Sequence, residues 1–66
     1  MFNKEDRVYD VRFGYGTVNS IENKMIHVDF DKFGRKSYTL DGCYFEGEYR
    51  SLFFRNTFET LNNPKL

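Results

Sequence analysis

The chain has one cysteine, one proline, no tryptophan and no long apolar run, and each scarcity removes a class of protein. A single thiol, Cys43, cannot form an intramolecular disulfide, so the staple of very small secreted domains is absent. Cys43 and His27 are also too few ligands for a structural zinc ion, which needs about four. No segment reaches the roughly 18 apolar residues of a membrane helix or has the pattern of a secretion signal. We therefore expect a cytoplasmic protein without metal, cofactor or membrane segment.

Net charge is also missing, because ten basic side chains balance ten acidic ones. Non-specific binding to nucleic acid depends on phosphate neutralisation and usually leaves a basic stripe in the sequence. Here the basic residues are scattered, and only Arg35 and Lys36 are adjacent. Charge therefore disfavours nucleic acid as the partner without removing it. The residues that would serve such a partner are Arg12, Lys32, Arg35 and Lys36.

Aromatic residues are abundant, at 20% of a 66-residue chain, and the apolar pattern has a period of two. In residues 25–30, Ile26, Val28 and Phe30 alternate with less apolar residues, as in a strand with one buried face. We expect further strands at 7–10, 17–22, 35–40 and 51–54, with a bulge near 19–20. The expected turns lie at 14–16, at 22–24, where Asn23 suits a left-handed conformation, and at 31–34.

These short strands predict a small all-β unit of five strands over residues 1–55, followed by a tail at 56–66. One alternative for the end of the chain is a short helix, because Phe54, Phe58 and Leu61 follow a helical spacing. A core of about ten side chains would leave stability near zero at this size, so a partner surface or dimerisation would help. The expected core is Val8, Phe13, Val18, Ile21, Ile26, Val28, Phe30, Tyr38, Leu40 and one of Leu52, Phe53 and Phe54.

Part of this pattern resembles known small barrels. Arg7-Val8, the run Phe13-Gly14-Tyr15-Gly16-Thr17-Val18, Ile21 and Val28-Asp29-Phe30 are similar to the SH3-like, Tudor-like barrels at the C-terminus of repair helicases of the UvrD/PcrA type. They also resemble the RNA-polymerase-interacting domain of CarD-like proteins. The likeness covers residues 5–40, with Glu5-Asp6 where those families have Gly-Asp. It implies a five-stranded SH3-like barrel and non-enzymatic recognition of a protein, often RNA polymerase. Residues 41–54 instead resemble the ending of small bacterial and phage proteins.

Catalytic groups are few. His27 is expected on the solvent side of its strand, and a functional histidine needs a partner that orients it. A nucleophile pair of Cys43 and His27 would need a cavity that so small a chain hardly provides. Gly14-Tyr15-Gly16 lacks the third glycine and the following helix of a dinucleotide fingerprint. We therefore expect a protein that is not an enzyme and has no catalytic residue.

Aromatic side chains outside the expected core are the main candidates for function. They could plug the ends of the barrel, form a protein-binding patch, cage an alkylated ammonium group or stack on unpaired bases. Tyr15 and Phe33 are expected at the tips of two loops that converge on one rim. The candidate partner-binding residues are Tyr9, Tyr15, Phe33, Tyr44, Phe45 and Tyr49.

The leading hypothesis is a module that binds another protein through these aromatic loop tips and an exposed strand edge. Its partner could belong to the transcription or repair machinery. Two alternatives stay open: a nucleic-acid-associated module, and a small phage or mobile-element inhibitor of a larger enzyme. A homodimer is also compatible with the sequence.

Overall fold

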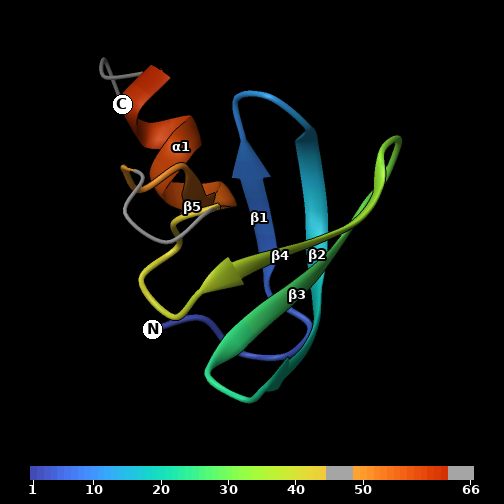
Figure 1. Ribbon diagram of the computed structural model, residues 1–66. Coiled ribbons are helices and arrows are strands. Elements are labelled where there is room, and N and C mark those ends of the chain that lie inside the picture. Colours follow the sequence, from blue (N-terminus) through green and yellow to red (C-terminus); the bar gives the residue numbers. More distant parts are fainter. Residues whose placement is uncertain (45–48, 63–66) are drawn as a thin grey trace.

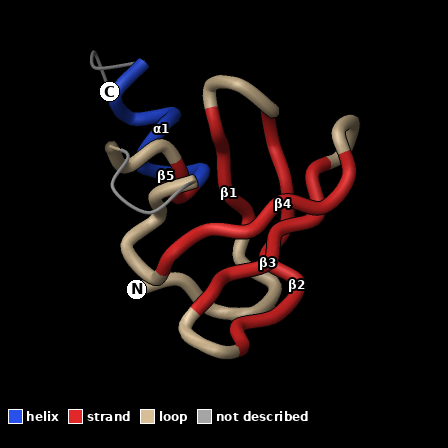
Figure 2. The backbone as a smooth tube through the Cα atoms, in the orientation of Figure 1, coloured by secondary structure: helices blue, strands red, loops and turns tan. Residues whose placement is uncertain are grey.

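The computed structural model describes residues 1–44 and 49–62, with only the backbone considered for Phe58 and residues 60–62. This part of the chain forms one antiparallel sheet with the strand order β4-β3-β2-β1-β5, followed by a short helix (Figures 1 and 2). The all-β fold class is therefore confirmed, together with the alternative of a short C-terminal helix. The elements are β1 (Arg7–Asp10), β2 (Gly14–Glu22), β3 (Met25–Phe30), β4 (Gly34–Thr39), β5 (Leu52–Phe54) and α1 (Arg55–Asn62).

The longest strand, β2, pairs with both β1 and β3 and contains the expected bulge. The pairing register with β3 shifts between Val18 and Ser20, which gives β2 one extra residue. The hairpin that follows is closed by Asn23 and Lys24, with φ angles of 52° and 63°. Two consecutive residues with positive φ form the tight turn whose twist matches that of the flanking strands. The bulge and the left-handed Asn23 thus both follow the sequence pattern.

The turn expected at residues 14–16 is wrong, because this segment is the start of β2. The chain reverses earlier, at residues 11–13, where the Phe13 amide donates to the Asp10 carbonyl at 3.1 Å. Gly16 is buried, and a Cβ atom there would lie 2.8 Å from Cδ1 of Phe30. Glycine is therefore required at this position by the close approach of β3 and not by a turn.

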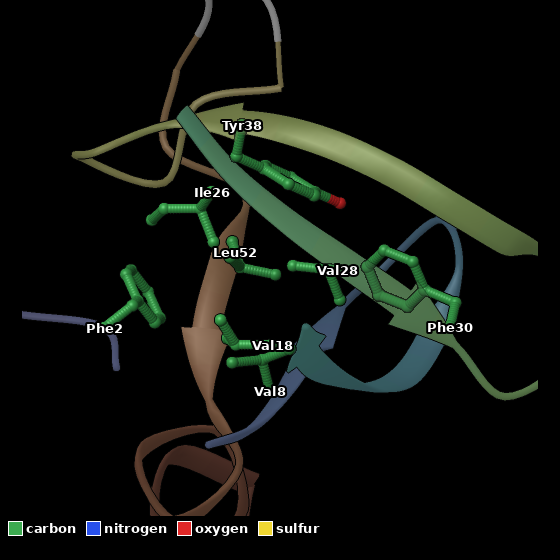
Figure 3. Close-up of a cluster of buried hydrophobic side chains, with 8 residues drawn as sticks. All are labelled: Phe2, Val8, Val18, Ile26, Val28, Phe30, Tyr38 and Leu52. Carbon is green, nitrogen blue, oxygen red and sulfur yellow. The ribbon is translucent and has the colours of Figure 1, made fainter. Parts of the chain in front are cut away.

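The core is formed by side chains on one face of the sheet and contains most of the expected residues (Figure 3). Phe13 is only partly buried and packs against this core, whereas Ile21 and Leu40 are exposed over 39% and 42% of their surfaces. Ile21 does lie opposite Ile26, but near the end of a hairpin that extends past the core. Leu40 lies in the turn after β4. The buried hydrophobic side chains are Phe2, Val8, Val18, Ile26, Val28, Phe30, Tyr38 and Leu52.

Residues 40–44 begin the segment between β4 and β5. The Thr39 amide donates to the Cys43 carbonyl at 2.9 Å, and the amides of residues 51 and 52 both donate to the Gly42 carbonyl at 3.0 Å. The helix α1 then packs beside β1 and β5, on the left of Figure 1. No helix within the described ranges is both long and apolar enough to cross a lipid bilayer.

Candidate functional site: a cation–aromatic cluster

Three aromatic rings meet at one end of the sheet, two from the turns that follow β1 and β3 and one from the segment after β4. Since β1 and β3 both pair antiparallel with β2, they run in the same direction and their turns lie at the same end of the sheet. Phe13, at the end of the first turn, lies 6.0 Å from Phe33 in the second turn and 5.5 Å from Tyr44, measured between ring centroids. Its ring also lies 5.3 Å from that of Phe30. The three rings therefore extend the core outward at this end.

Two basic side chains lie over these rings. The guanidinium carbon of Arg12 is 4.6 Å from the centroid of Tyr44 and 5.4 Å from that of Phe13. The ammonium group of Lys36 is 5.0 Å from the centroid of Phe13. Such cation–π contacts hold the charges against the apolar surface. We call this set the cation–aromatic cluster; its members are Arg12, Phe13, Phe33, Lys36 and Tyr44.

A buried carboxylate holds Arg12 in place. Asp10 is 0% exposed and accepts hydrogen bonds from the Tyr38 hydroxyl and the Arg12 amide, both at 2.7 Å. The Arg12 guanidinium donates to Asp10 at 3.3 Å and to Ser51 at 2.8 Å. The side chains of Asp10 and Arg12 together thus link β1, β4 and the residue before β5.

The protonation of Asp10 follows from these bonds. Burial by itself would raise the pKa of Asp10, but the bonds from the Arg12 amide, the Tyr38 hydroxyl and the Arg12 guanidinium outweigh it, so the pKa lies below its ordinary value. Burial, together with the bond to the Asp10 carboxylate, raises the pKa of Tyr38 far above its ordinary value. The pair is therefore a carboxylate and a neutral phenol at neutral pH.

Sequence reasoning missed Asp10, although two features of the sequence indicate it. Asp10 has the same inward phase as Val8, two residues earlier in β1. Tyr38 was expected in the core, and a buried tyrosine hydroxyl needs a hydrogen-bond partner. A carboxylate on the inward face of another strand is a suitable acceptor.

The structure divides the aromatic residues predicted for partner binding. Tyr15 lies in β2 and not at a loop tip, and its ring meets that of Tyr9 edge-on at 4.9 Å on the outer face. The Tyr15 hydroxyl donates to Glu59 of α1 at 3.2 Å. Phe33 and Tyr44 lie together in the cluster, and Tyr49 is 95% exposed. Phe45 lies outside the described residues.

The basic residues predicted for nucleic acid also separate into two groups. Arg12 and Lys36 belong to the cluster, and Lys32 is exposed in the turn beside it. Arg35 lies on the outer face, where its guanidinium donates twice to the Asp29 carboxylate, at 2.8 and 3.3 Å. These bonds lower the pKa of Asp29. The charge of Arg35 is thus largely neutralised within the chain.

Other polar groups offer little chemistry. The Nδ1 atom of His27 is 2.8 Å from the Ser37 hydroxyl on the outer face. The main chain of Cys43 pairs with that of Arg50 in an isolated antiparallel β-bridge. Among the residues that the structure describes, no three histidine, cysteine or acidic side chains gather as metal ligands. A pocket of about 240 Å³ has a lining of mixed charge that favours no ligand class: Glu5, Asp6, Arg7, Phe54, Arg55 and Asn56.

Because Arg12 is paired with Asp10 while Lys36 has no carboxylate partner among the described side chains, the cluster suits an anionic group that also offers apolar surface. Arg12 and Lys36 already lie against the faces of Tyr44 and Phe13, so an alkylated ammonium ligand would meet like charge there. Phe33, by contrast, is 57% exposed while its ring packs against that of Phe13.

Neither a model of any known protein family nor any curated protein sequence matches this chain.

Proposed function

We propose that the chain is a module that binds another protein, through the cation–aromatic cluster and the adjoining edge of β4. The exposed ring of Phe33 is the observation that carries this proposal, because a large apolar side chain fixed among packed rings suits an interface anchor. The resemblance to barrels that bind RNA polymerase makes a transcription or repair protein the first partner class to test.

The edge of the sheet adds a second kind of contact. Within residues 1–44 and 49–62, β4 is the terminal strand of the sheet and pairs with β3 alone, and it begins one residue after Phe33. An exposed strand edge offers main-chain hydrogen bonds, while neighbouring pockets and rings select side chains. A partner that used both surfaces would therefore gain affinity from the edge and specificity from the cluster.

Nucleic acid is the second candidate, on the observation that Arg12 and Lys36 lie over aromatic rings. Base stacking beside basic groups is the usual arrangement for single strands. The pairing of Arg35 with Asp29, of Arg7 with Asp31 and of Arg12 with Asp10 weighs against it, because these arginines already have carboxylate partners. Binding to a protein depends less on unpaired basic side chains than binding to nucleic acid does.

Affinity capture with matched variants tests the proposal. A tagged chain, its Phe33→Ala variant and its Ile21→Ala variant are used to capture proteins from cells that make the chain. Ile21 is a suitable control because it is also a partly exposed apolar residue but lies at the opposite end of the sheet. We expect a protein that the wild type and the control retain and that Phe33→Ala loses, by about tenfold or more.

Two results would contradict the protein-binding function. One is equal capture of every protein by all three chains. The other is binding of a single-stranded oligothymidylate that weakens steeply with salt and is lost in Phe33→Ala, which would favour the nucleic-acid function instead.

A further inference from the structure

The main-chain groups of β4 that face away from the sheet can be assigned from the register. In an antiparallel pair, opposed residues alternate between exchanging hydrogen bonds and exchanging none. The Asp31 amide donates to the Tyr15 carbonyl at 2.9 Å, so the next pair, Gly16 and Phe30, exchanges none. Phe30 therefore turns its amide and carbonyl toward β4.

The same alternation continues along β4. Phe30 exchanges hydrogen bonds with Gly34, and so do the pairs Val28–Lys36 and Ile26–Tyr38. The residues between them, Arg35, Ser37 and Thr39, point their main-chain groups away from β3. An independent contact agrees, because the Thr39 amide donates to Cys43, which lies outside the β3–β4 pair.

Two residues are left as the open part of this edge. Thr39 is engaged by residues 42 and 43, whereas no main-chain partner for Arg35 or Ser37 occurs within residues 1–44 and 49–62. Each of these two residues presents one donor and one acceptor. Between them, Lys36 directs its side chain to the inner face, where its ammonium group lies over Phe13.

We propose that an extended acidic segment of a partner protein adds to the sheet beside β4. Its main chain bonds to Arg35 and Ser37, and one of its carboxylates lies against Lys36. This inference rests on the proposed protein-binding function and specifies the partner's chemistry. The segment enters as a strand because an open edge bonds any extended backbone, and the residue opposite Lys36 then lies on the same face as the cluster.

The charge of the edge selects the acidic side chain. A carboxylate opposite Lys36 forms a cross-strand pair with an ammonium group that has no carboxylate partner among the described side chains. On the outer face, Arg35 is already paired with Asp29, so the outward positions of the segment need no charge. One acidic residue at an inward position is therefore the minimal requirement.

A second copy of this chain fits the edge poorly. An antiparallel β4–β4 pair that uses both open residues sets Arg35 opposite Ser37 of the other copy, which places Lys36 directly opposite Lys36. Like charges directly opposite one another destabilise a sheet. Moving the register by two residues instead requires the Thr39 amide, which is engaged, or sets Ser37 opposite residue 33, which lies before β4 begins. The edge therefore discourages self-pairing.

A pair of variants at Ser37 isolates the main-chain contact. Ser37→Pro removes the outward-facing amide and blocks strand addition, while the ladder to β3 does not use that amide. Ser37→Ala loses the same hydroxyl contact with His27 but keeps the amide, so it is the matched control. Circular dichroism and thermal melting verify that both variants are folded.

The probe is a blocked heptapeptide, Thr-Val-Thr-Glu-Thr-Val-Thr, with a version that has Lys in place of Glu. In NMR titrations we expect the Glu peptide to shift the amides of Arg35 and Ser37 and to slow their hydrogen exchange. Without peptide these two amides exchange faster than those of Lys36 and Tyr38. Ser37→Pro weakens binding by about tenfold or more and Ser37→Ala by less than about twofold, whereas Lys36→Glu reverses the preference to the Lys peptide.

Several outcomes would overturn strand addition. Equal binding by the Ser37→Pro and Ser37→Ala variants removes the main-chain contact, and equal binding of the Glu and Lys peptides removes the acidic requirement. A concentration-dependent dimer that Ser37→Pro abolishes, seen by analytical ultracentrifugation, would identify a second copy as the occupant. If no peptide binds while Phe33→Ala still loses its captured protein, this inference fails and the protein-binding function stands.

Discussion

Replacing Asp10 by alanine tests whether its buried network holds the fold together. The substitution leaves the Tyr38 hydroxyl without its acceptor inside the core, which costs about 1–3 kcal/mol. The Arg12 amide loses a bond of 2.7 Å, worth about 0.5–1.5 kcal/mol. The Arg12 side chain is 39% exposed, so solvent screens its loss, which adds less than about 1 kcal/mol. The expected total is about 1.5–5.5 kcal/mol.

That amount is large for this chain, because a domain of this length has a total stability of about 3–10 kcal/mol. Urea denaturation followed by circular dichroism measures it. Tyr38→Phe, which removes only the hydroxyl, is the matched comparison. The double variant completes a thermodynamic cycle in which we expect the two losses to be clearly less than additive. A loss below about 1 kcal/mol for Asp10→Ala, or full additivity with Tyr38→Phe, would refute the network.

The pH dependence gives a second measure of the same group. The pKa of Asp10 is lower in the folded chain than in the unfolded chain, so folding favours the carboxylate. Its contribution is complete above the unfolded value of about 3.9 and is lost as the pH falls through that value toward the folded pKa. Asp29 and Asp31 have lowered pKa values too and add to the acid loss. Asp10→Asn should therefore flatten the decline of stability below about pH 4 without abolishing it.

Two further substitutions test the packing. Gly16→Ala places a Cβ atom 2.8–2.9 Å from Phe30, Asp29 and Val28. We therefore expect the free energy of unfolding to fall by about 1–3 kcal/mol and the melting temperature by at least about 4 °C. An unchanged melting temperature would contradict the close approach. Phe2→Ala removes a ring that is 3% exposed and stacks on Phe54 at 4.4 Å, so urea denaturation should show a loss of about 3–5 kcal/mol. A loss near zero would mean that the N-terminal residues are not part of the core.

The strands were predictable because buried apolar residues alternate with less apolar residues along the chain. The alternation in Met25–Phe30 identifies its inward face without further information, and the irregular spacing in β2 indicates the bulge. Phe2 was missed because it lies outside any strand, where no period marks which residues are buried. Periodicity finds buried residues within regular elements but not in the segments that cover their ends.

The site was less predictable for a related reason. One glycine on each side of Tyr15 is typical of a turn, but the close approach of β3 at Gly16 also requires glycine. The sequence alone cannot distinguish these two reasons for a glycine. As a result Tyr15 was expected beside Phe33, although it faces outward from β2. Phe33 and Tyr44 were identified among the aromatic residues, whereas their grouping with Arg12 and Lys36 depends on tertiary contacts far apart in the sequence.

Stability and recognition are connected in this molecule through Arg12. Its guanidinium is bonded to the buried Asp10 and to Ser51 while its face lies against Tyr44. A long basic side chain held in this way has already lost much of its rotamer freedom on folding, so an anionic partner would not have to immobilise it again. The carboxylate that supports the core thereby also pre-organises one of the two charges of the cation–aromatic cluster. Lys36 has no such carboxylate anchor among the side chains that the structure describes, and its ammonium can follow the partner, which suits the position opposite an incoming strand.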